Sequence, residues 1–220
     1  MSVTPLRPKT PERPPESPPE PSPDLLARFR LDGAALSQDV RAALGALEAE
    51  ADALRARAER AEHMADRDAL TPILNRRAFV RELKRQVAYC RRYGAQAALV
   101  YLDLDRFKAV NDAYGHAGGD AVLEHVAATL LAHVRESDVV GRLGGDEFAV
   151  LLVQADRAAA ETKAQALIEA LHAAPARLGG HEIPVRASYG VRSLEPGLDA
   201  ASLMAEADAA MFVRKASSRV

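Results

Sequence analysis

Tryptophan is absent from the sequence and cysteine occurs once, at Cys90, so no disulfide can form within the chain. This composition is typical of proteins from reducing compartments. Lysine and arginine number 29 against 31 acidic residues, so the basic excess of a duplex nucleic-acid binder is missing. No apolar run reaches the roughly 18 residues of a membrane span, and the amino terminus lacks an apolar signal core. We therefore expect a cytoplasmic protein with no nucleic-acid partner and no membrane span.

Apolar residues are also scarce at the amino terminus. Nine of the thirteen prolines lie between Pro5 and Pro23, among charged residues and serines. Such a stretch has few amide donors and little apolar area, and it predicts an extended, disordered tail over residues 1–35. A docking motif for a proline-binding protein is the alternative.

Residues 36–67 follow a heptad pattern. Apolar side chains recur in steps of four and three and form a narrow stripe between charged faces. The pattern predicts a parallel coiled coil that holds a homodimer. The alternatives are a single amphipathic helix packed on the globular domain and a helix that binds another protein. The seam residues are Val40, Leu44, Leu47, Ala51, Leu54, Ala58, Ala61 and Ala65.

Residues 68–220 alternate between helical and strand patterns. Strands are expected at 97–104, 139–143, 147–153 and 184–193, and helices at 79–93, 118–136, 158–173 and 200–215. Gly144 and Gly145 separate two of the strands and predict a hairpin. The order favours an α/β domain of the α+β kind, a mainly antiparallel sheet covered by helices, over a doubly wound parallel sheet.

Acidic residues gather at the ends of two of these strands. Asp103 and Asp105 close one strand and alternate along it, so they can share a face. Asp146 and Glu147 follow the hairpin glycines. If the strands are neighbours, carboxylates from both converge, and hard oxygen ligands of this kind suit Mg²⁺ or Mn²⁺. Each motif alone has a simpler interpretation, as solvated aspartates at a strand end or as an ordinary turn.

Residues that suit a nucleotide lie near these carboxylates. Gly144 and Gly145 permit positive φ and leave room for a triphosphate, and Lys108 supplies a positive charge. Asn111 and Asp120 bracket a glycine-rich segment that suits a loop opening the next helix. An amide and a carboxylate together can read the edge of guanine, although Asp120 as a helix cap is the alternative. The whole set indicates nucleotidyl transfer.

These motifs together resemble the GGDEF domain family, over Asp68 to Arg219. Asp68-Ala69-Leu70-Thr71 is similar to the motif that opens the family's domain. The string from Asp103 to Asp120 matches D-x-D-x-F-K-x-x-N-D-x-x-G-H-x-x-G-D at every fixed position, and Arg142 to Phe148 carries the signature itself. The resemblance implies a ferredoxin-like palm of the nucleotidyl cyclase type, here preceded by the coiled-coil helix.

The resemblance also implies an activity and its residues. A diguanylate cyclase condenses two GTP molecules into cyclic di-GMP, with release of pyrophosphate, where two domains of a homodimer meet. The implied catalytic residues are Asp146, Glu147 and Lys108. The implied metal ligands are Asp103, the Leu104 carbonyl and Asp146. The implied substrate contacts are Lys108, Asn111, His116, Asp120, Gly144, Gly145, Lys215 and Arg219.

A regulatory motif belongs to the same resemblance. Arg135-Glu136-Ser137-Asp138, separated from Gly144 by five residues, matches the family's R-x-x-D site, where the product binds and inhibits. The alternative is an ordinary salt bridge at a helix end. For the whole chain, the alternative function is a non-catalytic cyclic di-GMP receptor or GTP-binding signalling protein. Departures from the family pattern occur at Pro72, Ser218 and Val220, none of which is an implied metal ligand.

Overall fold

A computed structural model describes residues 19–195 and 197–217 of the chain, without the side chains of residues 58–64 and 217. The chain divides into two compact units, Met1–His63 and Met64–Val220. Within the described residues, no helix combines the length and the apolar character that crossing a bilayer would require.

The described part of the amino-terminal unit contains α1 (Pro23–Phe29) and most of α2 (Gln38–Asp66). Ser22 caps α1, because its hydroxyl accepts a hydrogen bond from the amide of Leu25. The predicted tail over residues 1–35 is therefore helical in part, since α1 lies within it. For residues 1–18, which lie outside the described residues, the tail stays a prediction. α2 spans the residues of the heptad pattern.

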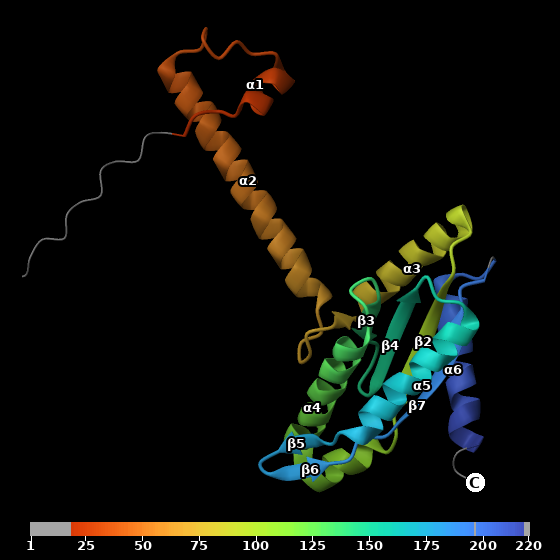
Figure 1. Cartoon of the computed structure of the whole chain (residues 1–220). Coiled ribbons are helices and arrows are strands. Elements are labelled where there is room, and N and C mark those ends of the chain that lie inside the picture. The colour runs from red at the N-terminus through yellow and green to blue at the C-terminus, as the bar shows by residue number, and fades with distance from the viewer. Residues whose placement is uncertain (1–18, 196, 218–220) are drawn as a thin grey trace, which may run out of the picture. The chain divides into compact units, whose positions relative to one another are not determined.

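The second unit contains a five-stranded sheet in the order β1-β3-β4-β2-β7 (Figure 1). β1 runs parallel to β3, and the other neighbouring strands are antiparallel. The predicted mixed fold with a mainly antiparallel sheet is thus confirmed. The strands of this sheet are β1 (Leu74–Asn75), β2 (Ala97–Leu104), β3 (Val139–Arg142), β4 (Glu147–Val153) and β7 (Ala187–Ser193). The helices are α3 (Arg76–Tyr93), α4 (Phe107–His133), α5 (Arg157–Ala173) and α6 (Ala200–Ser217).

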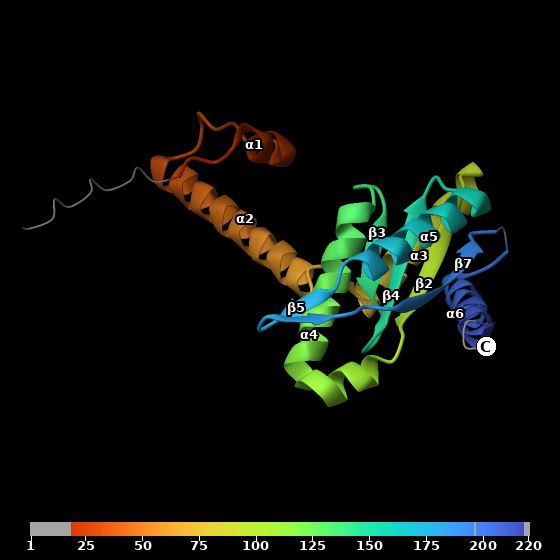
Figure 2. The ribbon, with the colours of Figure 1, turned by 60° about the horizontal axis from the view of Figure 1, so that its bottom comes forward.

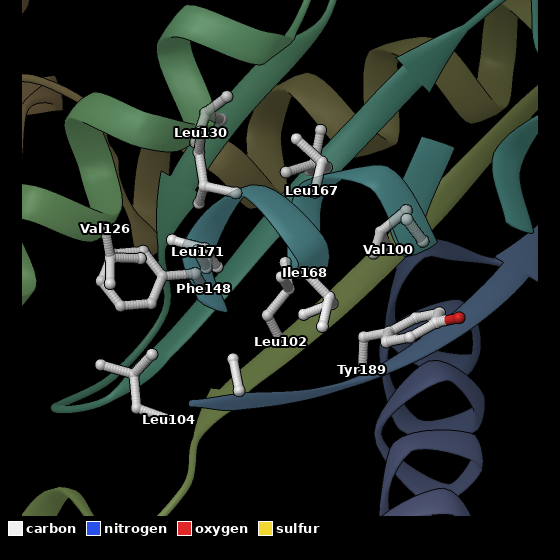
Figure 3. Packing of buried hydrophobic residues seen from close by; sticks show 14 of the residues in the cluster. Val100, Leu102, Leu104, Val126, Leu130, Phe148, Leu167, Ile168, Leu171 and Tyr189 are labelled. Atoms are coloured by element: carbon white, nitrogen blue, oxygen red, sulfur yellow. The ribbon is translucent and has the colours of Figure 1, made fainter. Parts of the chain in front are cut away.

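Each face of the sheet buries its own hydrophobic core, and β2 contributes to both. Val100 and Leu102 pack with residues of α4 and α5, whereas Leu99 and Tyr101 pack with residues of α3 and α6. Figures 1 and 2 show these helix pairs on opposite sides of the sheet. In Figure 3, side chains of α4 and α5 converge on Leu102 and on Phe148 of β4. A strand buried on both faces explains why β2 reads as a continuous apolar run.

Two parts of the second unit differ from the sequence predictions. The loop expected at residues 111–120 is helical, because α4 begins at Phe107 and bends at Gly115, which has φ 70°. A small hairpin of β5 (Ala176–Leu178) and β6 (His181–Ile183) was not predicted. Strands of three residues are too short for a period-two pattern to emerge.

Gly190 of β7 allows α6 to lie directly against the sheet. A Cβ at this position would overlap the carbonyl oxygen of Ala207 and would lie 3.1 Å from the carbonyl carbon of Ala210. Both atoms belong to the backbone of α6, so no side-chain rotation can relieve the clash. The glycine therefore fixes how closely the last helix approaches the central strands.

We predict that Gly190→Ala lowers the free energy of unfolding by roughly 1–3 kcal/mol, the usual cost of overpacking. Urea denaturation followed by circular dichroism measures it. Ala209→Gln, at an exposed position of α6, is the matched control and should stay within about 0.5 kcal/mol of the wild type. An unchanged unfolding midpoint for Gly190→Ala would contradict the close packing of α6.

Candidate active site

Three polar side chains form a row across the middle of the sheet. β2 lies between β4 and β7, and Asp103 pairs with Glu147 on one side and with Ser188 on the other. Side chains alternate along a strand, so Asp103 shares the face of Leu99 and Tyr101, which belong to the core with α6. Glu147, Asp103 and Ser188 therefore line the sheet on the side covered by α6.

Asp146 meets this row from the turn before β4. Its carbonyl accepts a hydrogen bond of 3.1 Å from the amide of Leu104. Burial, followed by the negative charge of Asp103, raises the pKa of Asp146 above its ordinary value. The two carboxylates are thus close enough to repel each other, which a bound cation would relieve. The structure brings Asp103 and Asp146 together as the sequence pattern predicts.

Lys215 reaches the same place from the last turns of α6. Its ammonium forms an ion pair with Asp103 and lies 3.3 Å from Oδ1 of Asp105. Burial opposes the charged form, but the hydrogen bonds and charges of Asp103 and Asp105 outweigh it and raise the pKa of Lys215. Asp105 also accepts a hydrogen bond of 2.9 Å from the hydroxyl of Ser188. Asp103 and Asp105 therefore share one face, as their alternation indicates.

The glycine turn is fixed by close approach and not by unusual backbone angles, because neither Gly144 nor Gly145 has positive φ. A Cβ at Gly144 would lie 2.5 Å from Oε2 of Glu147, whereas Gly145 faces open space. Glu147 also shares a hydrogen bond with Tyr101, and burial, followed by the charge of Glu147, raises the pKa of that tyrosine. The Glu147 carboxylate thus lies against Gly144, and the space beside the backbone of Gly145 is open.

Arg142, which begins the signature and to which the sequence assigns no role, holds the glycine turn in place. Arg142 donates to the carbonyl of Gly145 at 2.8 Å and to that of Gly144 at 3.1 Å, and its Nη1 lies 3.1 Å from Oδ1 of Asp68. Asp68 also accepts from the hydroxyl of Thr71 at 2.7 Å. Burial raises the pKa of Asp68, but the Thr71 and Arg142 hydrogen bonds together bring it below its ordinary value. Asp68, in the motif that opens the domain, therefore stabilises the glycine turn through Arg142.

The bend in α4 brings Asn111, one of the residues predicted to bind guanine, against the backbone of Gly119. Beyond Gly115 the helix folds back, and a Cβ at Gly119 would overlap Oδ1 of Asn111. Asn111 therefore lies against the backbone next to Asp120. Asp120 lies within α4 and not at its amino terminus, so the alternative in which it caps the start of a helix is wrong.

The other residues predicted to contact the substrate are either exposed or outside the described residues. Lys108 in the first turn of α4 is exposed, and so is His116 just after the bend. Lys108 has no ion pair within the residues that the structure describes. Arg219 lies outside the described residues.

The donor set at Asp103 and Asp146 fits a hard divalent cation. Across residues 19–195 and 197–217, no three His, Cys, Asp or Glu side chains are arranged to hold a metal by themselves. Magnesium does not need three, because one or two carboxylates with substrate phosphates and waters complete its shell. The raised pKa of Asp146 beside Asp103 and the ammonium drawn to Asp103 both indicate a place that attracts positive charge.

The predicted inhibitory pair lies at a separate cavity of about 380 Å³, lined by Arg135, Asp138 and residues of α5. The guanidinium of Arg135 does not pair with Asp138, so the ordinary helix-end salt bridge is not formed. Asp138 instead accepts from the backbone amides of Arg135 and Val153, each at 3.0 Å. The exposed side chain of Arg135 is therefore available to a ligand.

Comparison with known proteins identifies the family. The profile of the family described as "Diguanylate cyclase, GGDEF domain" matches residues 65–220. The chain belongs to the GGDEF family. Diguanylate cyclase TpbB of Pseudomonas aeruginosa is 37% identical over 186 residues, 84% of this chain and 43% of TpbB. The chain thus spans less than half of the length of this curated relative.

Solved structures agree with this family. The coiled coil and GGDEF domain of DgcB from Caulobacter crescentus, in complex with c-di-GMP, gives a TM-score of 0.75 at 29% identity. The match covers 82% of this chain and 96% of that one. A GGDEF domain does not fix the activity of a whole protein, however. Cyclic di-GMP phosphodiesterase PdeR of Escherichia coli is 35% identical over 162 residues, 73% of this chain and 24% of PdeR.

We predict that Asp68→Asn lowers the free energy of unfolding of this GGDEF domain by about 1.5–3 kcal/mol at pH 7, the range for hydrogen bonds to charged groups. The folded-state pKa of Asp68 is below its unfolded value. Its contribution is therefore present above the unfolded pKa and is lost as the pH falls through the folded pKa.

Urea denaturation of wild type and variant at pH 7 and at pH 3 tests this sign. The difference between them should shrink at the lower pH. Glu182→Gln removes an exposed pair with Arg177 and should cost at most about 1 kcal/mol. If the free energy of unfolding differs between Asp68→Asn and the wild type by the same amount at both pH values, the charge of the Asp68 carboxylate does not stabilise the turn.

Proposed function

We propose that the chain is a diguanylate cyclase, which joins two GTP molecules into cyclic di-GMP and releases two pyrophosphates. The observation that carries the proposal is the meeting of Asp103 and Asp146 beside Lys215, next to an open glycine turn. Carboxylates that attract a cation, a lysine and open space beside the backbone of Gly145 are what a nucleoside triphosphate requires. GTP is a cytoplasmic substrate, so the proposal also places the chain there.

Each nucleotide is held at its two ends by different elements. Asn111, which lies against Gly119 beyond the bend in α4, and the neighbouring Asp120 bind the guanine edge, and His116 also holds the guanosine. Gly144 and Gly145 admit the phosphates, which Lys108, Lys215 and Arg219 contact. Asp103, the Leu104 carbonyl and Asp146 would hold Mg²⁺ or Mn²⁺, which supplies charge stabilisation to the phosphate undergoing substitution.

The transfer step needs a nucleophile from a second nucleotide. The 3′-hydroxyl of one GTP attacks the α-phosphate of the other, and pyrophosphate leaves. Asp146 or Glu147 accepts the proton of that hydroxyl. Because each domain holds one GTP, two domains must face each other. A coiled coil through Val40, Leu47 and Leu54 of α2, whose side chains are 45%, 62% and 56% exposed, raises the effective concentration of the partner domain.

The product, cyclic di-GMP, binds in the cavity lined by Arg135 and Asp138 and inhibits the enzyme from there. The exposed Arg135 guanidinium can bind a phosphate or stack on guanine, and Asp138, held by two backbone amides, can accept from the base. Cyclic di-GMP carries both groups, and the site lies apart from Asp103 and Asp146, so inhibition is regulatory and not competitive.

The alternative is a receptor that binds GTP or cyclic di-GMP without turnover. The intact set of Asp103, Lys108, Asp146 and Glu147 favours catalysis, because a receptor has no need of residues that stabilise a transition state. Mass spectrometry of the products after incubation of the purified chain with GTP and Mg²⁺ separates the two. Cyclic di-GMP is expected, whereas bound, unchanged GTP at high protein concentration would favour the receptor.

We predict that Asp146→Ala and Glu147→Ala each reduce turnover by roughly a thousandfold or more, as loss of transition-state stabilisation does. Cyclic di-GMP formation measured by chromatography tests this. Glu195→Gln, at the opposite end of the sheet beyond β7, is the matched control and should keep wild-type turnover. Substantial product from either alanine variant would reject the assigned roles.

For the inhibitory site, Arg135→Ala should leave the initial rate unchanged and relieve inhibition by added cyclic di-GMP, with a shift of at least about tenfold for one lost charge-assisted contact. Progress curves at several product concentrations measure it. Arg177→Ala, an exposed arginine on β5, is the control. An inhibition curve that does not move for Arg135→Ala would place product binding elsewhere.

A further inference from the structure

We propose that Asp105, anchored by Ser188, forms with Asp103 a seat for the Lys215 ammonium, which substitutes for the divalent cation while no metal is bound. The inference deepens the proposed function, since it concerns the cation site of that activity. It assigns positioning roles to Asp105 and Ser188, neither of which has a role in the function proposed above.

Ser188 is the first element of the seat. Among the buried residues that the structure describes, Thr71 and Ser188 are the polar ones, and Ser188 is 8% exposed. Its hydroxyl donates to both oxygens of Asp105, at 2.9 and 3.2 Å. The amide of Asp105 also donates to the carbonyl of Arg186 at 2.8 Å. Side chain and backbone of Asp105 are thus both tied to the strand that carries Ser188 and the residues before it.

The ammonium of Lys215 lies between the two carboxylates. The side chain of Lys215 is 18% exposed, and those of Asp103 and Asp105 are 19% and 30% exposed. Asp146 contributes a third negative charge nearby. Partly buried carboxylates so close together are costly unless a cation is shared among them. Lys215 is the cation that this structure supplies.

Two consequences follow for metal binding. A divalent ion at Asp103 has to displace the ammonium, so Lys215 competes with the metal. Asp105 reduces this competition, because it retains the ammonium when Asp103 turns to the metal. From Asp105 the ammonium remains close enough to contact the phosphates that arrive with the metal.

Binding of Mn²⁺ to the nucleotide-free full chain, followed by electron paramagnetic resonance, tests the seat. Lys215→Met should tighten Mn²⁺ binding by about tenfold, and Lys108→Met, which removes an exposed ammonium with no ion pair in the described residues, should tighten it much less. Unchanged or weaker Mn²⁺ binding by Lys215→Met would overturn the proposal.

Ser188→Ala isolates the role of Asp105, because it changes no charge. It should weaken Mn²⁺ binding by about threefold or more when Lys215 is present and leave it unchanged in the Lys215→Met background. Ser188→Thr should restore wild-type binding. If Ser188→Ala weakens Mn²⁺ binding equally in the wild-type and Lys215→Met backgrounds, Ser188 has only a structural role. Cyclic di-GMP formation by the wild type is measured separately, so failure of the seat leaves the proposed function standing.

A separate set of contacts lies in the amino-terminal unit. We infer that residues 19–29, here called the strap, compete with a second copy of the chain for the seam of α2. Figure 1 shows α1 beside the first half of α2. Leu25 and Phe29 of α1 line a cavity of about 350 Å³ together with Leu44, Leu47 and Ala51 of α2.

Two contacts fix the strap. Ser22 donates from its amide to Glu48 at 2.7 Å and from its hydroxyl to the same carboxylate. At Gly45, a Cβ would overlap the carbonyl oxygen of Pro19 and lie 2.6 Å from its carbonyl carbon. Glycine in a helix interior costs about 1 kcal/mol relative to alanine, and the approach of Pro19 explains its presence.

The strap and a coiled-coil partner exclude each other. Leu44 and Ala51, at two of the a positions of the heptad, line the cavity beside the strap. Val40, Leu47 and Leu54, at d positions, remain largely exposed, although Leu47 also lines that cavity. A two-stranded coiled coil has to bury both sets. The strap therefore covers part of the surface that a second copy needs.

Sedimentation equilibrium of the full chain measures the competition. Ser22→Ala leaves the sequence of α2 unchanged and should tighten dimerisation by about threefold or more, since it removes the hydrogen bond from the Ser22 hydroxyl to the Glu48 carboxylate. Gly45→Ala should tighten it further. Ser22→Thr keeps the hydroxyl and should match the wild type. A weaker or unchanged dimer in Ser22→Ala and Gly45→Ala would overturn the inference.

The seam itself is tested by Leu47→Asp with Leu54→Asp, which should give a monomer with slow turnover in both the wild-type and the Ser22→Ala backgrounds. A dimer that survives both aspartates would mean that α2 is not the dimer interface, and would overturn the competition as well. Product analysis of the wild type decides the catalytic proposal independently.

Discussion

The site depends on the mutual repulsion of carboxylates held at one point of the sheet. β2 runs between β4 and β7, and its pairing sets Asp103 opposite Glu147 and Ser188, with Asp146 beside it. None of these groups can move far, because their backbones belong to buried strands or to a braced turn. Positive charge must therefore come to them. In this structure it comes from Lys215, and in the proposed enzyme from a divalent cation and its nucleotide.

Other parts of the domain maintain this arrangement. Arg142 ties the carbonyls of the glycine turn to Asp68, so the residues that open the domain also fix Asp146 and Glu147. Gly190 lets α6 approach β7 closely, and that approach brings Lys215 to the carboxylates. The two hydrophobic cores have a positioning role here, because they hold the strand and the helix that carry the opposite charges.

The sequence predicted most of this site because its signals are local. The alternation of Asp103 and Asp105 follows from the period of two along a strand, the limits of β2 follow from its continuous apolar run, and the hairpin follows from Gly144 and Gly145; the structure has all three. The contacts that were missed join distant segments. Arg142 with Asp68 and Ser188 with Asp105 are 74 and 83 residues apart, and no local pattern pairs them. The helical start of α4 was missed because Gly115, Gly118 and Gly119 suggest a loop, although here they allow a bent helix to fold on itself.

A crystal structure with Mn²⁺ and a GTP analogue that cannot be turned over tests the central claim most directly, because anomalous scattering locates the metal. The account predicts an ion bound by Asp103 and Asp146, with the Lys215 ammonium displaced from Asp103 toward the triphosphate. A metal bound away from these two carboxylates, or a Lys215 that keeps its ion pair with Asp103 in the loaded site, would contradict it.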